Sequence, residues 1–159
     1  DYEHPFVETF GPLPYYEIDP AYRVNAELLR YEQPRTVAVD TVIEGFQQFP
    51  LSPGIVAFEL DGQRYELEPT ISPNGRLFFV FGDDTNRDDT YGAGRFVYAD
   101  MPGEDGRLEL DFNKSYSPPC AFNDFSTCPV ASPRNRLPVR IEAGEKFDPN
   151  LHYPGAAAH

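Results

Sequence analysis

The sequence predicts an all-β fold, an antiparallel β-sandwich or small barrel of about eight strands with a proline-rich covering loop. Apolar and polar residues alternate in short runs bounded by Pro, Gly and Asp, which is the pattern of half-buried antiparallel strands. Apolar stripes at helical spacing are nearly absent. A chain of 159 residues has the size of one domain, so we assign residues 1–155 to a single β domain.

The first half of the chain contains four of the expected strands. Alternating runs at 22–28 and 37–43 each place apolar side chains on one face. Two further runs, 55–60 and 63–68, flank the dipeptide Asp61-Gly62. Because Asp-Gly favours a type I′ turn, these two runs predict a β-hairpin.

The second half contains the remaining strands. The run 76–81 is apolar on both faces, which is typical of a central strand. The runs 94–99 and 107–112 alternate on either side of the loop 103–106 and are interpreted as a second hairpin. A short run at 138–142 predicts a last strand.

Two segments differ from this pattern. Residues 115–138 are rich in proline, contain both cysteines and are too irregular for strand or helix. A loop of that length is either functional or an ordered flap that covers the sheet. Residues 156–159, Ala-Ala-Ala-His, resemble a cloning linker that enters a histidine tag, so they take no part in the functional argument.

The charge balance excludes two classes of partner. The 26 acidic residues against 13 basic ones leave a net charge of −13, which repels nucleic-acid phosphates and anionic lipid headgroups. We therefore expect no nucleic-acid and no membrane partner, and no apolar run approaches the roughly 20 residues that cross a bilayer. The start at Asp1 without Met leaves room for a leader that has been removed.

The acidity also suggests an environment. Only Lys114 and Lys146 are lysines, and the other basic residues are arginines. A surface rich in carboxylates and poor in lysine fits a protein kept hydrated in concentrated salt, so we expect a halophilic, salt-in cytoplasm. The alternative is an ordinary acidic protein whose charge only keeps it soluble.

Several stretches resemble a family of bacterial and archaeal proteins known as domain of unknown function, family 1684. They are TYGAGRF at 90–96, LDFN at 110–113 with Tyr116 and PPCAF at 118–122, and TCP at 127–129 with NRLPV at 135–139. Residues 15–24 resemble an earlier part of the family, so the similarity spans most of the chain. The resemblance implies no activity, but it directs attention to these stretches and, in the segment 83–91, to Thr85, Thr90 and Tyr91.

The two cysteines leave three readings open. Cys120 and Cys128 are eight positions apart, and a disulfide between them would contribute roughly 2.6 kcal/mol on the chain-entropy model. They could equally be reduced thiols packed with Phe122 and Phe125. Metal or redox chemistry is the third reading.

Histidine is too scarce to support a zinc site or a catalytic triad. The histidines are His4, His152 and the tag-like His159, all near the ends of the chain. Zinc requires four good ligands, and a hydroxyl or thiol nucleophile usually requires a nearby base. We assign no metal site.

The acidic loop 83–89 begins like a calcium loop. Asp84, Asn86 and Asp88 have the ligand spacing, but Asp89 stands where the loop requires glycine and Arg95 stands where it requires glutamate. We therefore expect a solvated hairpin loop of an acid-rich protein rather than a cation site.

The candidate ligand-binding residues are polar, cationic or aromatic and lie at strand ends or in the proline-rich segment. They are Thr90, Tyr91, Arg95, Asp111, Asn113, Tyr116, Asn135 and Arg136. The guanidinium groups of Arg95 and Arg136 suit bidentate capture of a carboxylate or phosphate, and the tyrosines provide flat walls. In the structural alternative, the two arginines are internal partners of Asp111 or of loop carbonyls.

Three functions follow from this assignment. The first is a non-catalytic module that binds a small anionic or aromatic molecule between the flap and the sheet. The second is an enzyme that uses the same pocket, through a cofactor such as a flavin or through Asp111 as a general base, although Glu109 and Asp111 at i, i+2 are more typical of a solvated strand face. The third is a structural or partner-binding domain. The residues themselves identify no cofactor.

Overall fold

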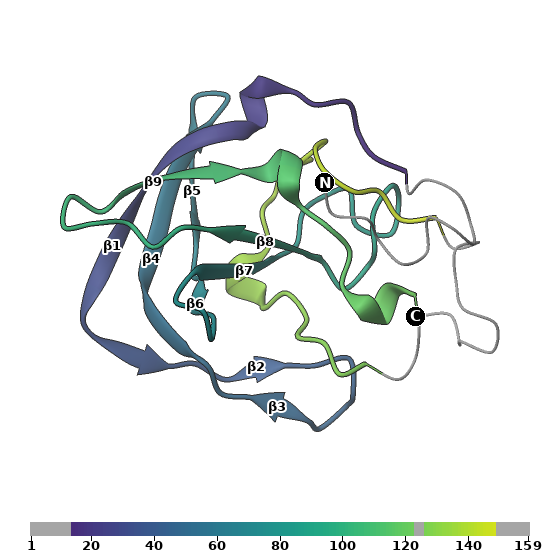
Figure 1. Ribbon diagram of the computed structural model, residues 1–159. Coiled ribbons are helices and arrows are strands. Elements are labelled where there is room, and N and C mark those ends of the chain that lie inside the picture. The colour runs from purple at the N-terminus through teal and green to yellow at the C-terminus, as the bar shows by residue number, and fades with distance from the viewer. Residues whose placement is uncertain (1–13, 123–125, 149–159) are drawn as a thin grey trace.

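The protein is all-β in a computed structural model that describes residues 14–122 and 126–148 (Figure 1). The strands are β1 (Arg23–Thr36), β2 (Val39–Asp40), β3 (Gln47–Gln48), β4 (Leu51–Leu60), β5 (Gln63–Leu67), β6 (Thr70–Ile71), β7 (Leu77–Phe81), β8 (Arg95–Ala99) and β9 (Arg107–Asp111). Short 3₁₀ turns are η1 (Pro20–Tyr22), η2 (Phe112–Lys114), η3 (Pro119–Ala121) and η4 (Pro133–Asn135). Within these ranges, no helix is long and apolar enough to cross a membrane. His4, Phe125, His152 and 156–159 lie outside the described residues.

The strands form a four-stranded sheet, a three-stranded sheet and a two-stranded hairpin. The large sheet has the order β5-β4-β1-β9, the small sheet the order β6-β7-β8, and β2 pairs with β3. All pairs are antiparallel, and none of these sheets closes into a barrel. In Figure 1 the hairpin β2–β3 lies apart from the other two sheets.

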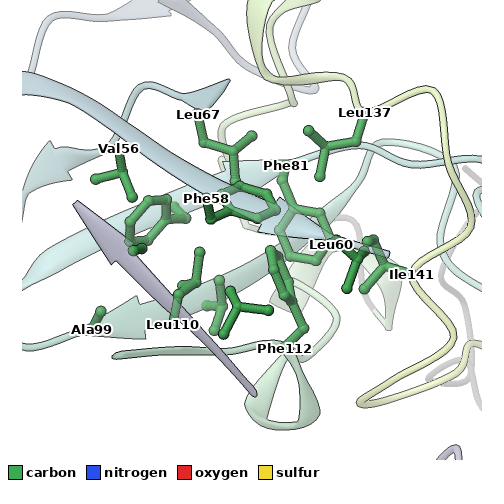
Figure 2. Close-up of a cluster of buried hydrophobic side chains, with 14 of the residues drawn as sticks. Val56, Phe58, Leu60, Leu67, Phe81, Ala99, Leu110, Phe112, Leu137 and Ile141 are labelled. Atoms are coloured by element: carbon green, nitrogen blue, oxygen red, sulfur yellow. The ribbon is translucent and has the colours of Figure 1, made fainter. Parts of the chain in front are cut away.

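The core lies where the inner faces of the two larger sheets meet. Val24, Ala26 and Leu28 alternate with exposed residues along β1, and Phe79 and Phe81 alternate along β7, as half-buried strands require. Figure 2 shows Phe81 and Phe112 within the same cluster, and their rings meet edge to face with centroids 5.3 Å apart. Burying a Val, Leu or Phe side chain of this cluster stabilises the fold by about 1.5–3 kcal/mol, so apolar alternation sets which face of each strand is inside.

Several sequence-based expectations are confirmed. The all-β class holds, β7 is the central strand of the small sheet, and β4 and β5 form the expected hairpin with Leu60 opposite Gln63. Asp61 has φ 51° and Gly62 has φ 77°, as a type I′ turn requires at both central positions.

The predicted second hairpin is wrong. β8 pairs with β7 and β9 pairs with β1, so the loop after β8 crosses from one sheet to the other. β9 has polar residues on its outer face, whereas β8 is buried on nearly all positions because other segments cover its outer face. Alternation alone does not identify the neighbouring strand.

Two other segments also differ from expectation. The run 138–142 is not a strand, because Ile141 N–H donates to the Asp83 carboxylate and the Ile141 carbonyl accepts from Arg95 instead of joining a ladder. In the run 37–43, only Val39–Asp40 is a strand. The chain turns directly afterwards, where the Thr41 hydroxyl donates to the Phe46 carbonyl.

The proline-rich segment covers part of the small sheet. Phe96 and Tyr116 exchange two backbone hydrogen bonds of 2.9 Å, and Leu137 N–H donates to the Gly82 carbonyl at 2.7 Å. Cys120 and Cys128 are joined by a disulfide with their Cα atoms 6.2 Å apart, and both lie buried beside Phe96.

Candidate functional site

Arg95 begins β8 and points into the protein. Its side chain is fully buried, and its guanidinium donates to the carbonyls of Ile141 at 2.8 Å and Ala143 at 2.5 Å. The Asp83 carboxylate lies 3.5 Å away, and the Phe81 ring lies 5.2 Å from the guanidinium carbon. Burial lowers the pKa of Arg95, and the charge of Asp83 opposes that shift. Arg95 therefore ties β8 to the backbone at 141–143.

The loop after β7 is only partly the solvated loop that the sequence predicts, because Asp84, Arg87 and Asp88 are exposed but other residues of the loop fold inward. Asp83, Thr85 and Thr90 are buried, and their polar groups bond to one another. The Asp83 carboxylate accepts from the Thr85 hydroxyl at 2.8 Å, and the two threonine hydroxyls lie 2.9 Å apart. Asn86 also donates to the Thr90 hydroxyl at 2.9 Å, and Asp88 pairs with Arg140 at 2.9 Å. In the described part of the chain, no group of three His, Cys, Asp or Glu side chains is placed to hold a metal ion.

Glu145 is a buried carboxylate beside Arg95. It is 1% exposed, its backbone carbonyl lies 3.4 Å from the Arg95 guanidinium, and Tyr15 O–H donates to its Oε2 at 3.5 Å. Oε1 has no hydrogen-bond partner among the described residues. Burial raises the pKa of Glu145 to about 7, while Ser117, Tyr15 and Arg95 act in the opposite direction.

Asp111 and Asn113 act together at the end of β9. The Asp111 carboxylate caps η2 by accepting from Asn113 N–H at 3.0 Å and from its side-chain amide at 2.9 Å. Asn113 in turn bonds both backbone groups of Asp19. The pair fixes the chain that enters β1 and does not lie with the two candidate arginines, and Glu109 pairs with Arg23 at 3.8 Å.

Tyr116 and Asn135 lie on the outer side of the small sheet. Tyr116 meets Phe96 edge to face and stacks on Tyr98 with centroids 6.5 Å apart. The Asn135 side chain forms two hydrogen bonds with the backbone of Glu68, at 2.8 and 2.9 Å.

The remaining three candidates line one surface depression of about 630 Å³. We call it the arginine depression, and its walls include Val42, Arg87, Thr90, Tyr91, Arg136 and Phe147. Tyr91 and Thr90 are buried, and the Tyr91 ring packs on Phe147 with centroids 5.3 Å apart. The structure therefore brings Thr90, Tyr91 and Arg136 together and separates them from Arg95.

Arg87 is the residue of this depression that sequence reasoning missed. It lies inside the run 83–89, where the acidic neighbours suggested calcium ligands or a solvated loop. Its φ of 70° is in the left-handed region, which few non-glycine residues adopt. A single arginine within an acidic run was the available signal, although its direction depends on how the loop folds.

Gly82 and Gly92 leave the space that the side chains of Arg136 and Arg87 occupy. A Cβ at Gly92 would lie 2.9 Å from Cγ of Arg87, and a Cβ at Gly82 would lie 3.0 Å from a terminal nitrogen of Arg136. Both side chains therefore lie across a glycine. Arg87 and Arg136 make no side-chain ion pair or hydrogen bond with another described residue.

These features define an all-β protein with an arginine-lined depression at one end of its small sheet. The model of a family described as "Protein of unknown function (DUF1684)" matches residues 8–146, and the chain belongs to this family. The chain is similar to an uncharacterised protein of Haloarcula marismortui with a solution NMR structure, at 31% identity and a TM-score of 0.70, over 87% of this chain and 78% of that one. No curated protein matches the chain.

Proposed function

We propose that the protein is a non-catalytic module that binds a small organic anion in the arginine depression. The observation that carries this proposal is the pair Arg87 and Arg136, two exposed guanidinium groups without a carboxylate partner in the described structure that line the same depression. In a chain of net charge −13, unneutralised positive charge of this kind is uncommon and attracts anions.

Most of the other arginines differ from this pair because their side chains have partners. Arg23, Arg35, Arg64, Arg76, Arg95, Arg134 and Arg140 pair with carboxylates, and Arg30 donates to two backbone carbonyls. Arg107 is the remaining arginine, and it lies away from the depression on β9. Within the described structure, Arg87 and Arg136 are the two arginines that lack a side-chain partner and line the same depression.

The lining chemistry favours binding over catalysis. The Thr90 hydroxyl is engaged with Thr85 and Asn86, and the Asp88 carboxylate is held by Arg140. Val42 and Phe147 add apolar surface for the organic part of a ligand, and a planar guanidinium matches a carboxylate or phosphate group.

The test compares phosphate and benzoate binding in three proteins. NMR titrations with inorganic phosphate and with benzoate in low-chloride buffer should shift backbone resonances of 87–93. The variant Arg87→Gln/Arg136→Gln should bind at least about tenfold more weakly, because each lost charge-assisted hydrogen bond contributes about 1.5–3 kcal/mol. Arg107→Gln removes the other arginine whose side chain has no partner among the described residues, so it is the matched control and should bind as the unmodified protein does. Equal binding by the double variant, or no binding of either anion, contradicts the proposal.

We further propose that the acidic surface is an adaptation to concentrated salt. The low lysine content and the similarity to a protein of Haloarcula marismortui support this environment. A cytoplasmic location stays a prediction, and the disulfide favours an oxidising compartment, because cytosolic thiols are generally kept reduced. Thiol titration of the protein taken directly from its cells would decide between the two compartments.

A further inference from the structure

A second cavity, of about 270 Å³, lies on the outer side of the small sheet. We call it the aromatic cleft, and its lining includes Val39, Pro50, Glu68, Phe78, Val80 and Tyr98. The small sheet, the chain around the hairpin β2–β3 and the segment 129–135 all contribute to its lining. Val130 contributes to both the cleft and the arginine depression, which otherwise have different linings.

Aromatic rings form the sheet wall of the cleft. The Phe78 ring centroid lies 4.8 Å from that of Phe96 and 4.9 Å from that of Tyr98. Tyr98 is backed by Tyr116, with an interplanar angle of 13°. The rings are therefore held in place by one another, and Phe78 and Tyr98 remain half-buried on the side that faces the cleft. A rigid wall of this kind favours a flat ring as its occupant, because ring pairs gain energy beyond their buried area.

Glu68 provides a polar group on the same lining. Its Oε2 accepts from Tyr31 O–H and from Arg35 at 3.2 Å, and Asn135 holds its backbone through two hydrogen bonds. Its Oε1 makes no hydrogen bond in the described structure and is 4.0 Å from Arg134. The side chain is only 11% exposed and pairs with Arg35 and Arg134, so this carboxylate is positioned in advance. Its Oε1 takes part in the Arg134 ion pair but in no hydrogen bond within the described structure, so it can still accept from a further donor.

We propose that the aromatic cleft binds an aromatic molecule of one or two rings that carries an N–H or O–H donor. Its ring packs against Phe78 and Tyr98, and its donor bonds to Glu68. A cavity of about 150 Å³ is enough to hold benzene, so 270 Å³ accommodates a bicyclic ring. The proposal is independent of anion binding at Arg87 and Arg136.

The test uses indole and indene, which have nearly the same shape but differ in the N–H donor. Indole should shift the resonances of Phe78, Val80 and Tyr98 in an NMR titration, and indene should bind about tenfold more weakly because it makes no hydrogen bond to Glu68. Equal binding of indene contradicts the role of Glu68. No shift with either compound up to its solubility limit overturns the proposal.

Cavity-filling variants locate the site. Ser132→Phe and Ala38→Trp each place a ring in the cleft from a partly or fully exposed lining position, and both should abolish indole binding. Asn25→Phe, on the exposed face of β1, is the control and should leave binding unchanged. If a folded cavity-filling variant still binds indole, the assignment of the site to this cleft is wrong. The variant Arg87→Gln/Arg136→Gln should bind indole as the unmodified protein does, because the two sites are distinct.

Discussion

Arg95 and Arg136 have the same side chain in opposite surroundings. Arg95 is buried among backbone carbonyls and the Asp83 carboxylate, and its Nε has no hydrogen-bond partner in the described structure. Arg136 is exposed, and its side chain makes no ion pair or hydrogen bond with residues 14–122 or 126–148. Removing one partner of a buried ion pair costs about 3–5 kcal/mol, so Arg95 is fitted to hold the fold, whereas Arg136 is the residue of the two that the proposed ligand would meet.

Glu145 makes stability depend on pH in an unusual direction. Most carboxylates lose stabilising interactions as pH falls, but burial raises the pKa of Glu145 from 4.5 to about 7. The folded protein therefore binds a proton here that the unfolded chain has already released between pH 4.5 and 7. The stability that Glu145 contributes is therefore fully present below pH 4.5, its pKa in the unfolded chain. It is lost as pH rises through about 7, its pKa in the folded protein.

Replacing Glu145 with glutamine should remove this dependence. The free energy of unfolding of the unmodified protein should fall by about 3 kcal/mol between pH 4.5 and pH 8 because of this group, and Glu145→Gln should lack that fall and be the more stable protein at pH 8. Urea unfolding at several pH values measures the difference. Glu142→Gln is the control, because Glu142 is exposed on the same segment. Parallel pH profiles for the unmodified protein and Glu145→Gln would refute the assignment.

At the scale of elements, the proline-rich segment depends on backbone contacts and one disulfide. Val42 N–H donates to the Cys128 carbonyl, and Val130 N–H donates to the Asp40 carbonyl, so the segment also anchors the hairpin β2–β3. Residues next to these two backbone hydrogen bonds line the proposed sites. Val39 lines the aromatic cleft, and Val42 lines the arginine depression.

Cys120→Ser/Cys128→Ser should lower the free energy of unfolding by about 2.6 kcal/mol, because the unfolded chain regains the freedom of the closed loop. Chemical denaturation with and without a reducing agent measures it. Reductant should destabilise the unmodified protein by a similar amount and leave the double variant unchanged. A double variant as stable as the unmodified protein would show that the disulfide does not support the fold.

Strand existence was more predictable than strand partnership. The β4–β5 hairpin follows from two adjacent residues with positive φ, which is a local property. The pairing of β9 with β1, by contrast, joins Val24 to Leu110 across most of the chain. Alternation specifies which face of a strand is apolar. Several strands of this chain have such a face, so the neighbour of each strand in the sheet is decided by the packing of the whole core.

At the scale of the molecule, the negative charge lies largely in turns and on outer strand faces. Asp61, Glu66, Glu104 and Asp105 are all exposed, so their charges repel one another through water. Salt shortens the range of this repulsion, from about 10 Å at 0.1 M to about 3 Å at 1 M.

We expect the melting temperature to rise on the order of 5–10 °C between about 0.1 M and about 2 M KCl. Differential scanning calorimetry measures it. The variant Glu66→Gln/Glu104→Gln/Asp105→Asn carries less surface charge and should show a smaller rise. Stability that is indifferent to KCl would contradict adaptation to concentrated salt.

The sequence alone determined the all-β class, the β4–β5 turn, the central strand β7, the acidic surface and the family. These are properties of composition, local turn chemistry and the alternation of apolar residues. The candidate sites were only partly predictable, since Thr90, Tyr91 and Arg136 share a depression but Arg95, Asp111 and Asn113 serve the fold. Arg95 is held inside by carbonyls 46 and 48 residues away that accept from it, and Arg87 and Arg136 line one depression only because of how the loop after β7 folds. Tertiary structure decided these roles because the surroundings of a charged side chain are made by residues distant in sequence.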